Sequence, residues 1–259
     1  MKIHAPNAEL VARRDWTDGL ATFSVRPAGW TLPDFVPGQF TNLALPEGED
    51  WDAVEGAAVR RAYSIASPPG QDALEFFVRR VDGGALTPRL FDLEVGAQLH
   101  MDTRAAGHFT LEGAQDAEVL LLVGTGTGVA PYRSMLLDPD SGLDRFRRIV
   151  LVYSDRTAAD IGHAEEFEAL AAEREGFAFL PTLTRADDAW DGLRGRVQGH
   201  LTPEAFTALL DAELSPERVQ VFLCGNPEMV TQVVEGLDAL GFKKHRKRDP
   251  GQVHFEKYW

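Results

Sequence analysis

Two glycine-rich segments of the chain have residue types and spacing that suit a phosphate group. Residues 123–131 read VGTGTGVAP, follow a short apolar run and open a helix-like stretch. Glycine lets a backbone approach a ligand closely, and N–H groups at a helix start face negative charge. Residues 83–88, GGALTP, have the same character in a weaker form. Both are candidate phosphate sites, and an ordinary tight turn is the alternative for each.

The chain's one cysteine, Cys224, ends another apolar run and is followed by Gly225, Asn226 and Pro227. In open α/β sheets, ligands bind outside the carboxyl ends of the strands. We therefore expect Cys224 to face the same crevice as residues 124–128. The alternative is a small, buried apolar side chain without a ligand.

Residues 60–67, RRAYSIAS, could bind a flat ring that carries a phosphate. On a strand, Arg61 and Tyr63 point to one face, and Ala62 and Ser64 to the other. Arginine can grip a phosphate, tyrosine can cover a ring, and a serine hydroxyl can bond a ring nitrogen. The alternative is an ordinary exposed edge strand.

The elements that must position these residues differ between the two halves. The first half contains short strand-like runs at residues 40–45, 63–66, 74–81 and 98–102, separated by Pro-Gly and Gly-Gly punctuation. This pattern predicts an antiparallel β-barrel of modest size.

In the second half, apolar strands alternate with helices. Strands are expected at residues 119–123, 149–153, 177–183 and 219–223, and helices at 131–137, 164–173, 203–210 and 228–240. Alternation of this kind predicts an α/β domain with a parallel sheet. The change of pattern near residues 111–117 divides the chain into expected domains at 1–112 and 113–259.

Three residues are typical of helix ends. Thr202 and Asn226 each precede a proline and a glutamate, the pattern of an N-cap, a first-turn proline and a favourable acid. Gly241 lies where a left-handed C-terminal cap is expected.

Composition restricts the classes of function. With 259 residues, 44% of them hydrophobic, the chain can bury two cores. A formal net charge of −14 argues against binding nucleic acid. No apolar run long enough to cross a membrane and no signal-peptide h-region are apparent, and a single cysteine fits a reducing, cytoplasmic setting. One cysteine also excludes a plant-type iron–sulfur cluster on this chain.

One strongly basic run interrupts the acidic sequence. Residues 243–248 read KKHRKR. It could be a solvated connection, or it could be a docking patch for an acidic protein partner formed by Lys243, Lys244, Arg246, Lys247 and Arg248.

Taken together and in order, these segments resemble the ferredoxin–NADP reductase family. The motifs are R-x-Y-S at residues 61–64, G-x-x-T at 84–87, G-T-G-T-G-x-A-P at 124–131, C-G-x-P at 224–227 and an aromatic C-terminus. The resemblance extends from residue 37 to residue 259. The closing run from residue 241 is most similar to the bacterial flavodoxin/ferredoxin–NADP reductases.

The resemblance implies a six-stranded antiparallel barrel that binds FAD and a five-stranded parallel sheet that binds NADP(H), with a C-terminal tail returning to the flavin. The implied enzyme transfers electrons between NADP(H) and an acidic one-electron carrier, ferredoxin or flavodoxin, and acts as a monomer without nucleic acid or membrane. Two alternatives are the reductase component of an oxygenase and a non-catalytic flavin- or nucleotide-binding regulatory module.

The resemblance also implies a set of site residues. Tyr63, Ser64 and Cys224 would be catalytic. FAD would be bound by Arg61, Ala62, Tyr63, Ser64, Phe77, Val78, Gly84, Leu86, Thr87, Thr127, Tyr258 and Trp259. NADP(H) would be bound by Gly126, Thr127, Gly128, Pro131, Arg156, Thr184, Arg185, Arg196, Cys224, Gly225, Asn226, Pro227 and Met229. No metal ligand is implied.

Within that set, Arg156, Arg185 and Arg196 would surround the 2′-phosphate and favour NADP over NAD. Asp155 argues the other way, since an acid near this point can prefer a free ribose hydroxyl. At the chain end, either Tyr258 or Trp259 would cover the flavin or its adenine. Glu256 could take part in proton transfer or be a solvated surface acid.

Overall fold

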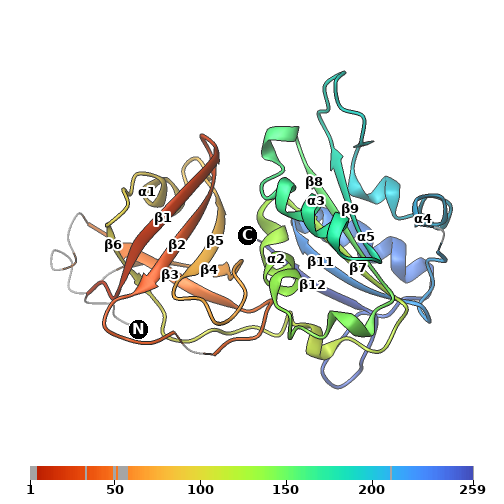
Figure 1. Ribbon diagram of the computed structural model, residues 1–259, viewed down its shortest axis with the longest axis horizontal. Coiled ribbons are helices and arrows are strands. Elements are labelled where there is room, and N and C mark those ends of the chain that lie inside the picture. Colours follow the sequence, from red (N-terminus) through yellow and green to blue (C-terminus); the bar gives the residue numbers. More distant parts are fainter. Residues whose placement is uncertain (1–4, 33, 49–50, 52–57, 211, 259) are drawn as a thin grey trace. The chain divides into compact units, whose positions relative to one another are not determined.

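The computed structural model describes residues 5–32, 34–48, 51, 58–210 and 212–258 (Figure 1), so Trp259 lies outside the described residues. The described residues form two compact units. The first is drawn from residues 1–110 and 130–141, and the second from residues 111–129 and 142–259. The domain limits expected from the sequence stay a prediction.

The first unit contains a six-stranded antiparallel sheet in the order β4-β3-β6-β1-β2-β5. Its strands are β1 (Ala8–Thr17), β2 (Leu20–Pro27), β3 (Phe40–Pro46), β4 (Ala58–Ser64), β5 (Leu74–Arg79) and β6 (Gln98–Met101). Just beyond β4, Ala66 N donates to Glu75 O of β5 at 2.8 Å. This bond connects the chain beyond one edge strand to the other edge strand, so the sheet curls as a barrel does.

Alternate residues of these strands fill the core of the first unit. Leu10, Val25, Leu43, Phe76 and Met101 are at most 1% exposed. Each such side chain removed from water contributes about 1.5–3 kcal/mol. Leu90 and Phe91 of α1 (Thr87–Phe91) belong to the same cluster.

The second unit contains a parallel sheet in the order β10-β9-β8-β7-β11-β12. Its strands are β7 (Val119–Thr125), β8 (Arg148–Asp155), β9 (Phe177–Leu183), β10 (Leu193–Arg194), β11 (Val219–Gly225) and β12 (Val253–Lys257). The sheet has six strands, so the expectation of five was wrong. The two-residue β10 is too short to give a pattern, and β12 reads VHFEK, without the apolar run of a buried strand.

Helices pack on both faces of this sheet. The helices are α3 (Ala164–Glu173), α4 (Pro203–Leu210) and α5 (Pro227–Ala239). On one face, Phe206 of α4 and Val230 of α5 share a core with Leu121 of β7. On the other face, Phe167 of α3 meets Tyr153 edge to face at 6.4 Å. Short 3₁₀ turns complete the chain: η1 (Leu111–Gly113), η2 (Gly126–Val129), η3 (Leu143–Arg145), η4 (Ala158–Asp160) and η5 (Val197–His200).

The predicted helix ends are confirmed. Thr202 Oγ1 accepts from Ala205 N at 3.2 Å, and the Asn226 side chain accepts from Glu228 N at 2.8 Å and from Met229 N. Gly241 follows α5 with a φ of +88°. These caps fix where α4 and α5 begin and where α5 ends.

The helix α2 (Ala130–Leu137) belongs to the first unit, although it follows a turn of the second. Arg133 donates to a Glu75 carboxylate oxygen at 2.6 Å and to Ala66 O at 2.9 Å. Ser134 Oγ donates to Ser67 O at 2.7 Å. Arg133 is only 8% exposed, so this ion pair anchors α2 beside β5.

Two glycine turns are pressed together at the carboxyl edge of the parallel sheet, after β7 and β11. A Cβ on Gly128 would lie 2.3 Å from Cys224 O, and a Cβ on Gly225 would lie 2.3 Å from Thr125 Oγ1. Gly225 also has a φ of +126°. No other residue fits either position without moving the backbone of the neighbouring turn.

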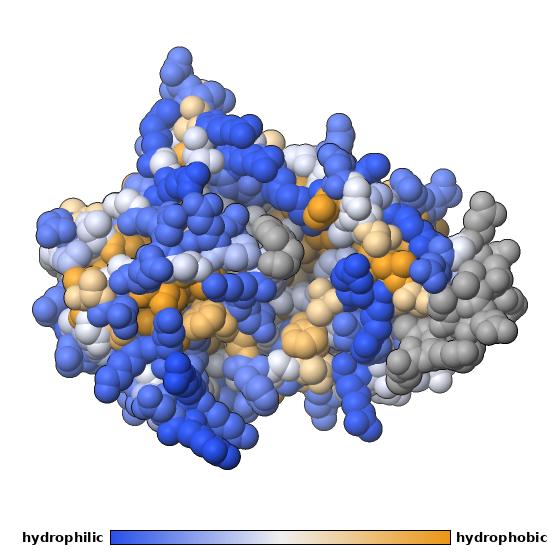
Figure 2. All heavy atoms as spheres, turned by 180° about the vertical axis from the view of Figure 1, so that it is seen from behind, coloured by the Kyte–Doolittle hydropathy of each residue, from blue (hydrophilic) through white to orange (hydrophobic). Residues whose placement is uncertain are grey.

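The face of the molecule in Figure 2 is mostly hydrophilic, with hydrophobic residues in separate patches. Across the described ranges, no helix is long and apolar enough to cross a membrane. Within the same residues, no cluster of His, Cys, Asp and Glu could hold a metal ion.

We predict opposite effects for two glycine-to-alanine changes. Gly128→Ala should lower the free energy of unfolding by about 1–3 kcal/mol, because its methyl group meets backbone atoms. Gly236→Ala, in α5 with nothing within 4 Å of its added Cβ, should raise it by about 0.5–1 kcal/mol. Urea denaturation measures both, and equal effects would contradict the close contact of the two turns.

Candidate functional site

Candidate residues occur on several elements of both units, and the first group lies at the end of β4. Arg61 is exposed, Tyr63 is half-buried and Ser64 is 7% exposed. The Tyr63 ring meets Phe76 edge to face at 6.4 Å. Burial raises the pKa of the Tyr63 phenol, and the nearby Arg61 guanidinium partly offsets this. Tyr63 therefore stays a neutral ring beside an exposed cation, and Ala62 between them is exposed.

The loop before α1 is closed by its own hydrogen bonds. Val81 N donates to Thr87 Oγ1 at 2.9 Å, and Gly84 N donates to Val81 O at 2.9 Å. Gly83 has a φ of +74°, and a Cβ on Gly84 would lie 2.9 Å from Val81 O. The Thr87 hydroxyl accepts one bond here and keeps its hydrogen to donate, which suits an anion.

Other expected FAD contacts are core residues. Leu86 is 1% exposed, Phe77 4% and Val78 2%. The Phe77 ring packs edge to face against Trp16 at 6.5 Å. The structure gives these three side chains a packing role.

In the second unit, the turns after β7 and β11 form the second group. Asn226 N donates to Thr125 Oγ1 at 2.9 Å, which ties the two turns together. Gly126 has a φ of +55°, and Thr127 is 8% exposed. A side chain at residue 128 or 225 would collide with its neighbours here, so the turn is a cradle bare of side chains, as close approach by a phosphate requires.

Cys224 lies beside two titratable residues of the chain end. Its register partner across β11 and β12 is Glu256, and Tyr258 N donates to Gly225 O at 3.0 Å. Burial, followed by the charge of Glu256, raises the pKa of the Cys224 thiol, while a hydrogen bond with Tyr258 lowers it. The thiol therefore stays neutral.

Glu256 is a candidate residue whose role the sequence left undecided. Burial raises the pKa of its carboxyl from 4.5 to about 7. A carboxyl that titrates near neutrality can both give and take a proton in the cell's pH range. The sequence around Glu256 lacks the apolar run of a buried strand, so β12 was not predicted and neither was the partial burial of this carboxyl.

The arginines expected at the 2′-phosphate follow β8, β9 and β10. Arg185 N donates to Arg156 O at 2.8 Å, so Arg156 and Arg185 are neighbours, and both are exposed. Thr184 N donates to Asp155 O at 3.0 Å. The Asp155 carboxylate accepts from Arg156 N at 2.8 Å. The structure thus brings Arg156, Thr184 and Arg185 together.

The remaining expected nucleotide residues are more dispersed. Arg196 is 69% exposed and lies 3.7 Å from Glu228 Oε1, in the first turn of α5. Pro227 begins α5, and Met229 is a core residue at 4% exposure. Pro131 lies in α2 and therefore in the first unit.

The basic run forms a rigid turn, which we call the basic hairpin (residues 243–251). Arg246 and Asp249 exchange two backbone hydrogen bonds of 3.0 Å. A Cβ on Gly251 would lie 2.4 Å from Lys243 O, so the base of the hairpin is closed backbone on backbone. Five cations of the hairpin are exposed, and none forms an ion pair within the described ranges: Lys243, Lys244, Arg246, Lys247 and Arg248.

Comparison with known proteins places this geometry in context. Residues 122–235 match the model of the oxidoreductase NAD-binding domain. The chain is 34% identical to the flavodoxin/ferredoxin–NADP reductase of Escherichia coli (strain K12), over 95% of each chain. It is 36% identical to ferredoxin–NADP reductase B of Sorangium cellulosum, over 97% of this chain and 96% of that one. A ferredoxin NADP⁺ reductase from Neisseria gonorrhoeae, solved with bound FAD and NADP, is 29% identical, with a TM-score of 0.87 over 98% of each chain.

Glu256→Gln tests the half-buried carboxyl. Because its pKa rises from 4.5 to about 7 on folding, ionising Glu256 destabilises the folded state as the pH rises through this window, and the loss persists above it. Glutamine carries no such penalty. We expect the variant's free energy of unfolding, relative to the wild type, to increase by about 1–2 kcal/mol between pH 5 and pH 8. Urea denaturation at both pH values measures this, and the exposed Glu235→Gln is the control that should show no change.

Proposed function

The chain belongs to the flavodoxin/ferredoxin–NADP reductase family, and from that premise we propose how its two groups of site residues serve the enzyme. It is an FAD-dependent oxidoreductase that transfers electrons between NADP(H) and ferredoxin or flavodoxin. The observation that carries this conclusion is the similarity over 95% of the chain to reductases of that name. We further propose that it is a cytoplasmic monomer and, from its net charge of −14, that it does not bind nucleic acid.

In this proposal the first unit holds FAD. Arg61 is an exposed cation on the strand that ends at the buried Ser64, and it binds the pyrophosphate. The neutral Tyr63 ring covers the isoalloxazine, and the Ser64 hydroxyl bonds near N5. The closed loop before α1 presents Thr87 and Gly84 to the phosphates. The fit rests on that loop, where no side chain can replace the hydrogen of Gly84 without a clash.

The second unit holds NADP(H) by the same logic. The bare cradle of η2 receives the pyrophosphate, with Thr127 at its side. Arg156 and Arg185, joined by a backbone hydrogen bond, grip the 2′-phosphate together with Thr184. The Asp155 carboxylate already accepts from Arg156 N, which weakens its competition for a ribose hydroxyl.

When bound, the cofactors supply the hydride and single-electron chemistry, and the protein supplies orientation and proton handling. Passing two electrons from NADPH to a one-electron carrier leaves one proton to be released. The neutral Cys224 thiol packs beside the nicotinamide site without adding charge. Glu256, next to it in register and titrating at about 7, takes up and gives up that proton.

We propose that the basic hairpin docks the electron carrier. Its five cations are exposed, and its backbone is closed by Gly251, so little loop ordering remains to be done on binding. On a chain of net charge −14, such a patch selects an acidic partner and orients it. Ferredoxin and flavodoxin are acidic carriers of this kind.

An anaerobic titration of the FAD-loaded protein tests the proposed function. NADPH should bleach the flavin absorption bands stoichiometrically, and NADH should do so poorly. Reduced flavin should then transfer electrons to added ferredoxin or flavodoxin. A protein that binds FAD but is not bleached by NADPH would refute the assignment.

Arginine variants test the 2′-phosphate contacts. Each lost charge-assisted bond is worth about 1.5–3 kcal/mol, so Arg156→Ala and Arg185→Ala should each raise KM for NADPH roughly 10- to 100-fold while changing KM for NADH little. Steady-state dye reduction measures both. Arg147→Ala, at an exposed arginine paired with Glu118, is the matched control. Equal effects on the two nucleotides would count against the assignment.

Charge reversal tests the docking surface. Lys247→Glu with Arg248→Glu should raise KM for the carrier roughly tenfold at low salt, and the effect should fade as salt screens the charges. NADPH-dependent dye reduction should be unchanged. Arg147→Glu with Arg174→Glu makes the same charge change at arginines that have carboxylate partners. If both double variants weaken the carrier equally, only net charge matters and the hairpin is not the docking surface.

A further inference from the structure

Two histidine rings and a phenylalanine ring form a stack in the second unit, in which Phe222 and His254 are buried and His245 is half-buried. His254 of β12 lies on Phe222 of β11 at 4.3 Å and 3°, and on His245 of the basic hairpin at 4.1 Å and 22°. His254 is 5% exposed. Gly113 lies against the stack, since a Cβ there would be 3.3 Å from His245 Nε2. The two imidazoles are therefore held in place by packing.

Each imidazole has a buried nitrogen without a partner. Within the described part of the chain, His254 Nε2 and His245 Nδ1 are inaccessible and form no hydrogen bond. A buried polar atom left unpaired is costly, and internal water is the usual partner of such atoms. The stack thus has two positions that call for water, both on side chains able to give a proton at one nitrogen and take it at the other.

Strand alternation places His254 of this stack on the same face of β12 as the Glu256 carboxyl. His254 and Glu256 are two residues apart on β12, so they share a face with their Cα atoms about 6.6 Å apart. Their register partners on β11 are Phe222 and Cys224. The Cys224 thiol interacts with both the Glu256 carboxyl and Tyr258. The ionisable neighbour of His254 is His245.

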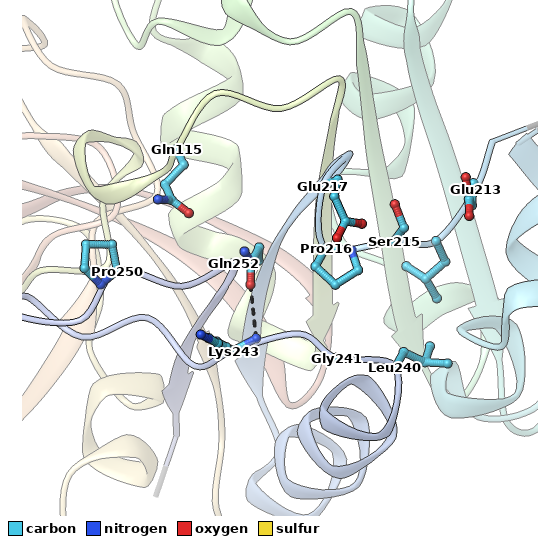
Figure 3. Close-up of a pocket in the computed structure, with 11 residues that line it drawn as sticks. Gln115, Glu213, Ser215, Pro216, Glu217, Leu240, Gly241, Lys243, Pro250 and Gln252 are labelled. Atoms are coloured by element: carbon cyan, nitrogen blue, oxygen red, sulfur yellow. Dashed lines mark hydrogen bonds between the residues drawn. The ribbon is translucent and has the colours of Figure 1, made fainter.

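The residue before β12, Gln252, reaches a cavity of the second unit. This cavity of about 620 Å³ is lined by Gln115, Lys243, Pro250 and Gln252, among others (Figure 3). Lys243 N donates to Gln252 Oε1 at 3.0 Å at its edge. Gln252 directly precedes β12 and is two residues from His254, and Lys243 is two residues from His245. By strand alternation Gln252 continues the face of His254 and Glu256 as far as the cavity, and the two histidines lie behind its lining.

We propose that His254 and His245, with water bound at their unpaired nitrogens, relay protons between this cavity and the Glu256 carboxyl. A proton leaves the carboxyl oxygen for the relay as another leaves the relay for solvent water, and no electrons move. This role rests on the proposed function, which places Glu256 at the site of proton release. His254 and His245 are positioning residues, because they act through Glu256.

The protonation state of the stack suits a relay. Burial, followed by the nearby His245, lowers the pKa of His254 to about 3. His254 is therefore neutral near pH 7, ready to accept a proton and unable to retain it. If His254 stored the proton instead of passing it on, its pKa would have to lie near that of Glu256.

Time-resolved infrared spectroscopy of the oxidised FAD-bound enzyme tests the relay directly. A laser-released caged proton lowers the pH from about 8 to about 6, a range that spans the Glu256 titration, and the Glu256 carboxyl band, identified by its loss in Glu256→Gln, reports protonation. His254→Phe keeps an aromatic ring in the stack and removes both nitrogens, so we expect at least roughly tenfold slower protonation. His245→Phe should act in the same direction. Unchanged rates in both variants, or no Glu256 band that titrates in this range, would overturn the relay.

The matched control is Phe222→Leu, which removes the ring on the other side of His254 and keeps both imidazoles. Its protonation rate should remain within about twofold of the wild type, and slowing equal to that of His254→Phe would mean that packing alone matters. Bleaching of the flavin by NADPH is measured on the same samples. If NADPH bleaches the flavin but Glu256 in His254→Phe is protonated at the wild-type rate, the relay is refuted and the proposed function stands. If NADPH does not bleach the flavin of the wild type, the proposed function is refuted.

Discussion

The candidate site of the second unit depends on one steric constraint, the backbone contact between the turns that follow β7 and β11. With Gly128 against Cys224 O and Gly225 against Thr125, the cradle, the thiol and the cap of α5 become one rigid piece. Asn226 contributes twice, since its N–H bonds Thr125 and its side chain caps α5. In the proposed function, phosphate binding and nicotinamide placement would therefore be set by the same few backbone atoms.

The pKa values of the titratable groups on the β11–β12 face are shifted toward the neutral form of each group. Burial disfavours the charged form of each group there, so the thiol stays protonated, His254 stays unprotonated and Glu256 titrates near neutrality. In the proposed function, a face built this way would exchange protons with little charge beside the nicotinamide ring. The permanent charges of the site, Arg61, Arg156 and Arg185, lie instead where phosphates are expected, at exposed positions.

Much of the fold could be predicted from local signals, and the failures have physical causes. The strand β9 and the helices α3 and α4 have the predicted bounds. An apolar run marks β9, and the Thr202 N-cap with a first-turn proline marks α4. β1 and β2 were not predicted: β1 carries Arg13, Arg14 and Asp15 and is only partly buried, so it lacks the pattern of a core strand. β10 and β12 are held by backbone pairing with β9 and β11, and the local sequence contains no sign of such pairing. For the site, motifs predict roles for residues 61–64, 84–87 and the η2 turn, and these roles stay predictions. The position of Glu256 beside Cys224 depends on strand register, a long-range property that no motif reports.

In the basic hairpin, the residues that fix the backbone differ from the exposed cations at the tip. Gly251, the paired bonds of Arg246 and Asp249 and the imidazole stack fix the base, while Lys247 and Arg248 at the tip support nothing else in the described structure. If the hairpin docks the carrier as proposed, a lineage can exchange one carrier for another by changing two side chains, without disturbing the oxidation of the nucleotide. Carrier choice and redox chemistry would then be free to evolve at different speeds.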